Sequence, residues 1–240
     1  MNLLQRLFKP KHASTANLCE VSNLQSNIGE QIIAIYEQSF PEAERDPVEN
    51  IAASLSRSTD NAEIRHLRAF MDQETVVGFT YFTSYREYYL GYLKFIAVRA
   101  DIRGKGYGPI LLQDAIQQLR ADGIRATGWP YLGLVFEVER PETAENEADR
   151  LLRERRIEFH RRNGAMMIEE VDYVAPPVSV DQPSLPFHLM VLRAVPKYRR
   201  QRWLRQKAVK ALLIEGYGEN PESWFVRHAL EVRQRARQSS

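Results

Sequence analysis

A glycine-rich run is the part of the sequence whose residue types and spacing suggest chemistry most directly. Arg103, Gly104, Lys105, Gly106 and Gly108 follow the apolar stretch FIAV within a few residues. Glycines let a backbone approach a ligand closely, and successive N–H groups at a helix start can hold a phosphate group. The run therefore suggests a site for a phosphate-bearing molecule. The alternative is a plain strand-to-helix turn.

The spacing of the run separates three kinds of phosphate loop. A P-loop requires Gly-Lys followed by Ser or Thr, whereas here Lys105 precedes Gly106 and neither residue type follows. A dinucleotide-binding fingerprint counted from Gly104 requires a third glycine at position 109, where a proline stands. The pattern R-x-x-G-x-G is met by Arg103, Gly106 and Gly108.

The elements around this run must position it, and strands are expected on its N-terminal side. Aromatic and β-branched residues predict two strands within 63–85, joined by a turn at Asp72 and Gln73, and a third strand over 89–98. The segment 131–139 is apolar at almost every position, as a centrally buried strand is. Closing strands are predicted over 165–174 and 186–195.

Helices are expected where apolar residues recur at three- and four-residue steps. These segments are 27–40, 46–57, 109–123 and 147–164, followed by two helices within 197–240. Asp46 is expected to cap the second helix, and Gly123 to end the helix after the glycine run. The order of helices and strands predicts a mixed α/β arrangement around one sheet.

The segment AVRADIRGKGYGPILLQDAI resembles the acetyl-CoA-binding motif of the GNAT N-acetyltransferase superfamily, and the element order over 28–193 is similar to that family as well. The resemblance implies an α/β (α+β) fold with a mixed, mostly antiparallel sheet, split at the acetyl-CoA site and flanked by helices. It implies acetyl-CoA as cosubstrate and no metal. The implied coenzyme A residues are Ile96, Ala97, Val98, Arg103, Gly104, Lys105, Gly106, Tyr107 and Gly108.

The resemblance also implies a general base. Glu137, in the sequence FEVE, occupies the position at which related ribosomal-protein alanine acetyltransferases carry a glutamate proposed as the base. A carboxylate in an apolar strand loses hydration, which raises its pKa toward a useful range. Glu139 points to the same face and is the reserve candidate. The alternative is that Glu137 is a buried partner for an arginine of the next helix.

A departure from the family pattern concerns the acid that protonates the leaving thiolate. Relatives usually carry a tyrosine in FY-x-x-x-G, and the matching run FHRRNG places His160 there. A protonated imidazole could donate to the thiolate, and a neutral one could hydrogen-bond the sulfur. The acid could also have moved, for example to Tyr107 or Tyr173. Arg153 stands where many relatives carry an asparagine that contacts coenzyme A.

The acceptor site is expected, by resemblance, near the turn SFPEAERDP. Glu42 and Glu44 could attract a cationic amine and Arg45 a carboxylate, while Tyr173 on the closing strands is a further candidate. A helix-connecting turn with solvated charges explains the same residues equally well. The acidic and tyrosine-rich candidates slightly favour a small-molecule amine over a protein acceptor.

A basic run lies near the C-terminus. Residues 193–210 contain eight Lys or Arg and no acid, interleaved with Tyr198 and Trp203. Such a run can bind RNA or an anionic membrane surface. The alternative is an amphipathic helix whose apolar side packs on the domain.

The bulk composition limits the class of protein. The chain has 240 residues, 44% hydrophobic and 27% charged, which is typical of a soluble globular protein, and no apolar run long enough to span a membrane. A single cysteine, Cys19, excludes an internal disulfide and fits a reducing cytoplasm. We expect a tail over 1–25, one domain over 26–195 and a basic helical extension over 196–240.

Together these features predict a cytoplasmic N-acetyltransferase, a monomer or homodimer, that transfers an acetyl group from acetyl-CoA to a small-molecule or peptide amine by direct attack in a ternary complex. Two alternatives stay open. One is a catalytically weak acyl-CoA-binding sensor or scaffold, and the other is an RNA-associated protein that uses the basic run.

Overall fold

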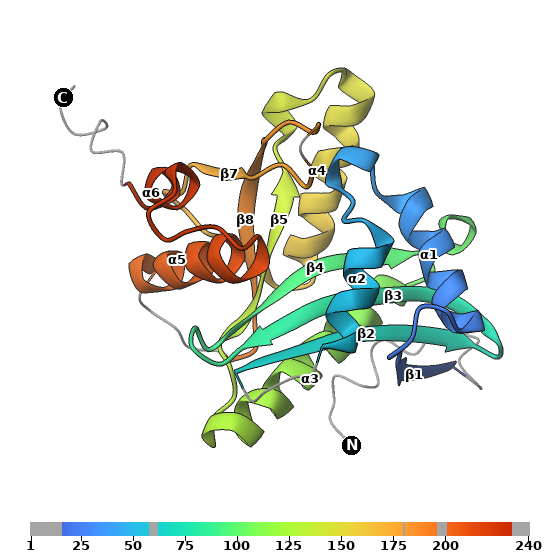
Figure 1. Cartoon of the computed structure of the whole chain (residues 1–240). Helices are drawn as coiled ribbons and strands as arrows, with labels where there is room; N and C mark the ends of the chain where they lie inside the picture. Colours follow the sequence, from blue (N-terminus) through green and yellow to red (C-terminus); the bar gives the residue numbers. More distant parts are fainter. Residues whose placement is uncertain (1–15, 58–61, 180, 196–200, 232–240) are drawn as a thin grey trace.

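One mixed, mostly antiparallel sheet of eight strands runs through the protein (Figure 1). The computed structural model describes residues 16–57, 62–179, 181–195 and 201–231. The strand order is β1-β2-β3-β4-β5-β8-β6, with β7 also paired to β8. The strands are β1 (Ala16–Glu20), β2 (Glu63–Asp72), β3 (Thr75–Tyr85), β4 (Leu90–Val98), β5 (Gly133–Glu139), β6 (Ala165–Met167), β7 (Tyr173–Ala175) and β8 (Leu185–Arg193).

Helices cover both faces of this sheet, which confirms the expected layers. The helices α1 and α2 lie on one face of β2, β3 and β4, and α3 lies on the opposite face (Figure 1). Their bounds are α1 (Asn27–Ser39), α2 (Val48–Ser56), α3 (Tyr107–Thr127), α4 (Glu147–Arg162), α5 (Gln201–Lys210), the π-helical η5 (Ala211–Gly216) and α6 (Trp224–Leu230), with 3-10 turns η2 (Glu42–Glu44), η3 (Ala100–Ile102) and η4 (Pro141–Thr143).

The structure differs from the sequence-based expectation at one helix end and one helix start. Gly123 lies inside α3, which continues to Thr127 and ends at Gly128 in the left-handed conformation (φ 80°). A Cβ on Gly123 would lie 2.3 Å from the Tyr131 backbone nitrogen, so this glycine permits close packing instead of ending the helix. Asp46 makes no cap for α2: Pro47 holds the capping position without a side-chain hydrogen bond, and the Asp46 carboxylate pairs with Lys94 at 2.5 Å.

The two ends of the domain also differ from expectation. Part of the expected N-terminal tail is strand β1, which pairs antiparallel with β2 from Ala16↔Asp72 to Glu20↔Arg68. The strand predicted over 165–174 is instead two short strands, β6 and β7, which pair with different parts of β8. The β2–β3 hairpin and its turn are confirmed.

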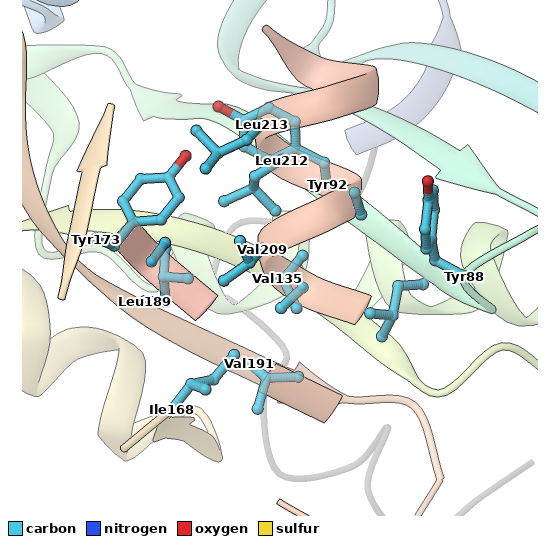
Figure 2. Close-up of a cluster of buried hydrophobic side chains, with 14 of the residues drawn as sticks. Tyr88, Tyr92, Val135, Ile168, Tyr173, Leu189, Val191, Val209, Leu212 and Leu213 are labelled. Atoms are coloured by element: carbon cyan, nitrogen blue, oxygen red, sulfur yellow. The ribbon is translucent and has the colours of Figure 1, made fainter. Parts of the chain in front are cut away.

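The C-terminal helices pack against the sheet and share its core. Buried side chains of α5 and η5, among them Val209, Leu212 and Leu213, contact a cluster that includes Tyr92, Val135, Tyr173 and Leu189 (Figure 2). Leu212 and Leu213 have no exposed surface. The segment 201–217 is therefore an integral part of the molecule on this face.

Candidate active site

A wedge opens in the sheet where β4 and β5 separate. The two strands run parallel but pair only at Gly91↔Leu134 and Tyr92↔Val135. Beyond that point β4 remains paired to β3 and β5 to β8, so residues 93–98 and 136–139 face each other without pairing. We call this opening the wedge. Unpaired strand edges offer backbone donors and acceptors to an extended ligand.

The glycine loop, residues 103–108, follows β4 and η3 and leads into α3. Gly104 and Gly106 adopt left-handed conformations (φ 83° and 87°), and nothing lies within 4 Å of a Cβ built on either. Among the described residues, the backbone N–H groups of 104–106 have no hydrogen-bond acceptor. The start of α3 also lacks a side-chain cap. Free N–H groups at a helix N-terminus make an anion cradle.

Two residues of the loop have structural contacts. The Arg103 guanidinium donates to the Val98 carbonyl (3.1 Å) and to the Ser39 hydroxyl (3.2 Å), which ties the loop to β4 and α1. A Cβ on Gly108 would lie 2.8 Å from the Phe159 ring, so this glycine lets α3 approach α4. Lys105 is exposed and Tyr107 half-buried, and Ile96, Ala97 and Val98 border the wedge on β4.

Glu137 lies at the narrow end of the wedge, inside a cage of three tyrosines. Its Oε1 accepts hydrogen bonds from Tyr173 (2.7 Å) and Tyr217 (3.0 Å), and its Oε2 accepts one from Tyr92 (2.5 Å). We call these three residues the tyrosine cage. Burial raises the pKa of Glu137, and the three hydroxyls and Lys94 oppose that change. Burial, together with the Glu137 charge, raises the pKa of each tyrosine well above its usual value, so the hydroxyls remain donors.

A line of polar contacts connects the cage to the surface. The Lys94 ammonium lies 5.5 Å from the Tyr217 ring centroid and pairs with Asp46 at the start of α2. Lys94 is also the residue at which the β3–β4 register shifts, since Tyr81 pairs with Phe95 and Phe82 with Leu93. Such a bulge re-aims a side chain, and here it turns Lys94 toward the cage.

Glu139, the reserve candidate for a base, forms ion pairs with α4. Its carboxylate contacts Arg156 and lies 3.5 Å from Arg153. Arg153 also pairs with Asp149 and donates to the Arg140 carbonyl. Arg153 thus joins α4 to β5 and the loop after it. The ion pairs leave Glu139 less suited than Glu137 to accept a proton.

His160 does not lie beside Glu137. Its ring packs against Phe136 (centroids 4.5 Å apart) and Phe159 (5.0 Å), and it is 8% exposed. Phe136 and Glu137 are consecutive on β5, so they point to opposite faces of the sheet. The buried Nδ1 of His160 has no hydrogen-bond partner. Burial lowers the pKa of His160 to about 4, so the imidazole is neutral at pH 7.

The expected acceptor residues divide into three places. Glu42 and Arg45 line a groove of about 310 Å³, whose other lining residues include Glu37, Asp46, Glu49, Val178, Ser179 and Gln182. We call this the acidic groove. Glu44 instead lies near Arg156 and Glu137, and burial raises its pKa. Tyr173 has no exposed surface and belongs to the cage, where its hydroxyl donates to Glu137.

Within its described part, the basic run is used largely for packing. Arg205 is 3% exposed and pairs with Glu170 at 3.2 Å. The Lys207 ammonium lies 4.5 Å from the Trp203 ring centroid and donates to the Glu87 carbonyl. Residues 196–200, with Tyr198, fall outside the described part. Residues 201–210 therefore form the amphipathic helix of the alternative interpretation.

Three residues of the site were missed by sequence reasoning: Tyr92, Lys94 and Tyr217. Tyr92 and Lys94 stand in the strand that leads to the glycine loop, and only the bulge brings both toward Glu137. Tyr217 is 80 residues away from Glu137 in the sequence. The local sequence signal for Tyr217 was its position between two glycines in EGYGEN.

The described ranges also bear on metal ligation and membrane insertion. No group of three or more His, Cys, Asp or Glu side chains there is arranged to hold a metal ion. In the same ranges, every helix is too short or too polar to cross a bilayer.

Comparison with known proteins relates the wedge and the glycine loop to one family. Residues 29–130 match the model of the acetyltransferase (GNAT) family, whereas a search of the curated proteins found no match. The matched residues run from α1 to the end of α3 and include the glycine loop, but not Glu137.

Solved structures with a similar fold cover most of this chain. A putative acetyltransferase of the GNAT family from Bacteroides thetaiotaomicron is 22% identical, with a TM-score of 0.64 over 85% of this chain and 99% of that one. An aminoglycoside 6'-N-acetyltransferase complexed with coenzyme A is 16% identical (TM-score 0.51, 76% and 99% covered). A putative acetyltransferase from Salmonella typhimurium with its cofactor acetyl-CoA is 15% identical (TM-score 0.50, 78% and 98% covered). At these identities the likeness shows the fold.

Proposed function

With a GNAT acetyltransferase match over residues 29–130 and a GNAT fold around it as the premise, we propose that this protein is an acetyl-CoA-dependent N-acetyltransferase. The observation that carries the proposal is the position of Glu137. Its half-buried carboxylate lies at the narrow end of the wedge and is held by three hydroxyl donors. A base is needed at that point to remove a proton from an attacking amine.

The glycine loop and the wedge fit acetyl-CoA. The free N–H groups of 104–106 and the uncapped start of α3 suit a pyrophosphate, and the space above Gly104 and Gly106 admits it. Lys105 adds a positive charge next to that cradle. The unpaired edge of Ile96–Val98 suits the amide groups of the pantetheine arm. Bound in this way, acetyl-CoA supplies the thioester that is attacked.

Glu137 has one acceptor position left for the amine. An ionised carboxylate offers about four lone-pair positions, and the tyrosine cage occupies three of them. The remaining position is on Oε2. There Glu137 first removes a proton from the ammonium, which frees the nitrogen lone pair. The neutral amine then attacks the thioester carbonyl, so that the C–N bond forms and the C–S bond breaks. The proton taken up by Glu137 balances the one that the leaving thiolate gains, so no other residue changes its charge over the whole reaction. The neutral His160 lies on the other face of β5.

The acceptor is a cationic primary amine that enters through the acidic groove. Glu37, Glu42, Asp46 and Glu49 outnumber Arg45 there, and Asp46 connects the groove to the cage through Lys94. A volume of about 310 Å³ suits a small molecule or a short peptide end. Because one neighbour of the fold is described as an aminoglycoside 6'-N-acetyltransferase, amino sugars are the first acceptors to try.

The sensor or scaffold alternative predicts acetyl-CoA binding without turnover. We therefore test turnover directly, by measuring free thiol released from acetyl-CoA in the presence of aminoglycosides, diamines, amino-acid amides and peptides. We expect release with at least one cationic amine and none with its acetylated form. If acetyl-CoA binds but no amine releases thiol, the protein is a sensor or scaffold and the proposed function is wrong.

The acceptor assignment has its own test. Glu42→Gln removes a negative charge from the rim of the groove, so the KM for a cationic acceptor should rise about 3- to 10-fold with kcat unchanged. Glu30→Gln is the matched control, because Glu30 is exposed in the first turn of α1 and does not line the groove. Equal KM values for both variants would contradict entry through the groove.

A further inference from the structure

The third donor of the tyrosine cage comes from a part of the chain outside the matched residues 29–130. Tyr92 is on β4 and Tyr173 on β7, but Tyr217 follows η5 at the end of the C-terminal helical segment. Its hydroxyl donates to Glu137 Oε1 at 3.0 Å. Nothing in the glycine loop or the wedge requires this residue, so its position needs a separate explanation.

The backbone of η5 is shaped to bring Tyr217 to Glu137. The Tyr217 N–H donates to the Leu212 carbonyl, five residues earlier, at 2.9 Å, which is the hydrogen bond of a π-helix. Leu212 and Leu213 are fully buried against the sheet and fix the segment. Single π turns of this kind are rare and occur often at functional sites, because they redirect one side chain without breaking the helix.

Close packing next to Tyr217 also indicates that η5 places this residue beside Glu137. A Cβ on Gly216 would lie 2.8 Å from the Tyr92 ring, so only a glycine lets η5 come this near to the second tyrosine of the cage. One residue earlier, Glu215 accepts a hydrogen bond from Tyr88 at 3.0 Å. Gly216 and Tyr217 thus contact the site, whereas the Glu215 contact with Tyr88 lies outside it.

We propose that Tyr217 is a positioning residue that holds the Glu137 carboxylate ionised and oriented for proton abstraction, so the C-terminal segment completes the active site. Oε1 is then held by Tyr173 and Tyr217, and Oε2 is left with one free position. A hydroxyl that donates to a carboxylate favours its charged form over its protonated form. The inference rests on the proposed function of Glu137.

Tyr217→Phe tests this proposal, with Tyr88→Phe as the matched control. Each change removes one tyrosine hydroxyl that donates to a glutamate between the C-terminal segment and the rest of the domain. Tyr217 donates to Glu137, whereas Tyr88 donates to Glu215. In protein labelled with ¹³C at the glutamate side-chain carboxyl, the Glu137 signal is assigned by its loss in Glu137→Gln. We expect the pKa of Glu137 to be higher in Tyr217→Phe than in the wild type, and unchanged in Tyr88→Phe.

Turnover gives a second readout. In Tyr217→Phe the acidic limb of the kcat profile should move to higher pH and kcat at pH 7 should fall about 3- to 10-fold, with the KM for acetyl-CoA unchanged. An unchanged Glu137 titration in Tyr217→Phe overturns the inference, whether or not an acceptor is known. If the wild type acetylates no amine, the proposed function is wrong. The titration of Glu137 in Tyr217→Phe still decides whether Tyr217 holds the carboxylate ionised.

Discussion

The two faces of strand β5 present the same physical problem with opposite outcomes. On one face the half-buried Glu137 receives three hydroxyl donors, and on the other His160 is buried against Phe136 with an unpaired Nδ1. Burial favours the neutral form of both side chains. Hydrogen-bond partners, and not burial alone, therefore decide which titratable group remains available for chemistry.

The largest effect is expected on the Glu137 face. Glu137→Gln keeps the shape of the side chain but cannot accept a proton, so kcat should fall about 10²- to 10³-fold. Acetyl-CoA affinity should change less than about twofold, because the glycine loop is untouched. Steady-state kinetics and calorimetry measure the two quantities. Equal losses of turnover and affinity, or unchanged turnover, would contradict the assignment of Glu137 as the base.

The next effect concerns acid stability and comes from the His160 face. The pKa of His160 is lowered to about 4, below the ordinary value of 6.5. Between these pH values the unfolded chain binds a proton that the folded chain does not, so the free energy of unfolding falls as the pH falls. The loss is up to about 3 kcal/mol.

Urea unfolding between pH 7 and pH 4 measures this loss. The comparison is with His160→Leu, since carboxylates titrate in both proteins and their contribution cancels. The stability difference between wild type and His160→Leu should shift in favour of the variant as the pH is lowered. A difference that does not vary with pH would show that His160 is not held neutral by burial.

A second buried histidine sharpens the comparison, because it has the partners that His160 lacks. His66 contacts Asp122 at 2.8 Å and Glu20 at 3.2 Å. Burial alone would lower the pKa of His66, but these two carboxylates raise it to about 9. Its contribution to stability is complete below pH 6.5 and disappears as the pH rises through 9, up to about 3 kcal/mol in all.

Unfolding measured from pH 6 to pH 10 tests the role of His66, with His66→Gln as the variant that cannot titrate. The wild type should lose stability across this range relative to His66→Gln. The opposite slope, or none, would mean that the carboxylates do not hold a proton on His66. The two histidines should therefore destabilise the protein at opposite ends of the pH scale.

The smallest effect is expected for His160 in catalysis. His160→Leu should leave kcat at pH 7 within about threefold of the wild type, because the neutral imidazole lies on the opposite face of β5 from Glu137. The pH profile of kcat should also keep its shape. A large loss of kcat in a folded variant that still binds acetyl-CoA would restore His160 to the role that its sequence position suggested.

The glycine loop and the order of helices and strands along the chain were predictable because their signals are local. The pattern R-x-x-G-x-G and the alternation of apolar segments each lie within about 20 residues of sequence. The cage was not predictable, because Tyr92, Tyr173 and Tyr217 are brought to Glu137 by the β4 bulge, the β7–β8 pairing and the π turn. Gly123 was misread because glycine marks both helix ends and close packing.

Calorimetric titration with acetyl-CoA tests the central claim most directly, because the whole account depends on that molecule occupying the glycine loop and the wedge. The variant is Gly106→Val and its matched control is Gly128→Val. Both glycines have positive φ and open space around a Cβ, but Gly128 ends α3 far from the loop in sequence. Backbone strain is therefore similar in the two variants.

We predict that wild type and Gly128→Val bind acetyl-CoA with a Kd of about 1–100 µM, while Gly106→Val does not bind. NADH and ATP serve as control ligands and should bind to none of the three proteins at these concentrations. Absence of acetyl-CoA binding to the wild type, or equal binding to both variants, would contradict the account.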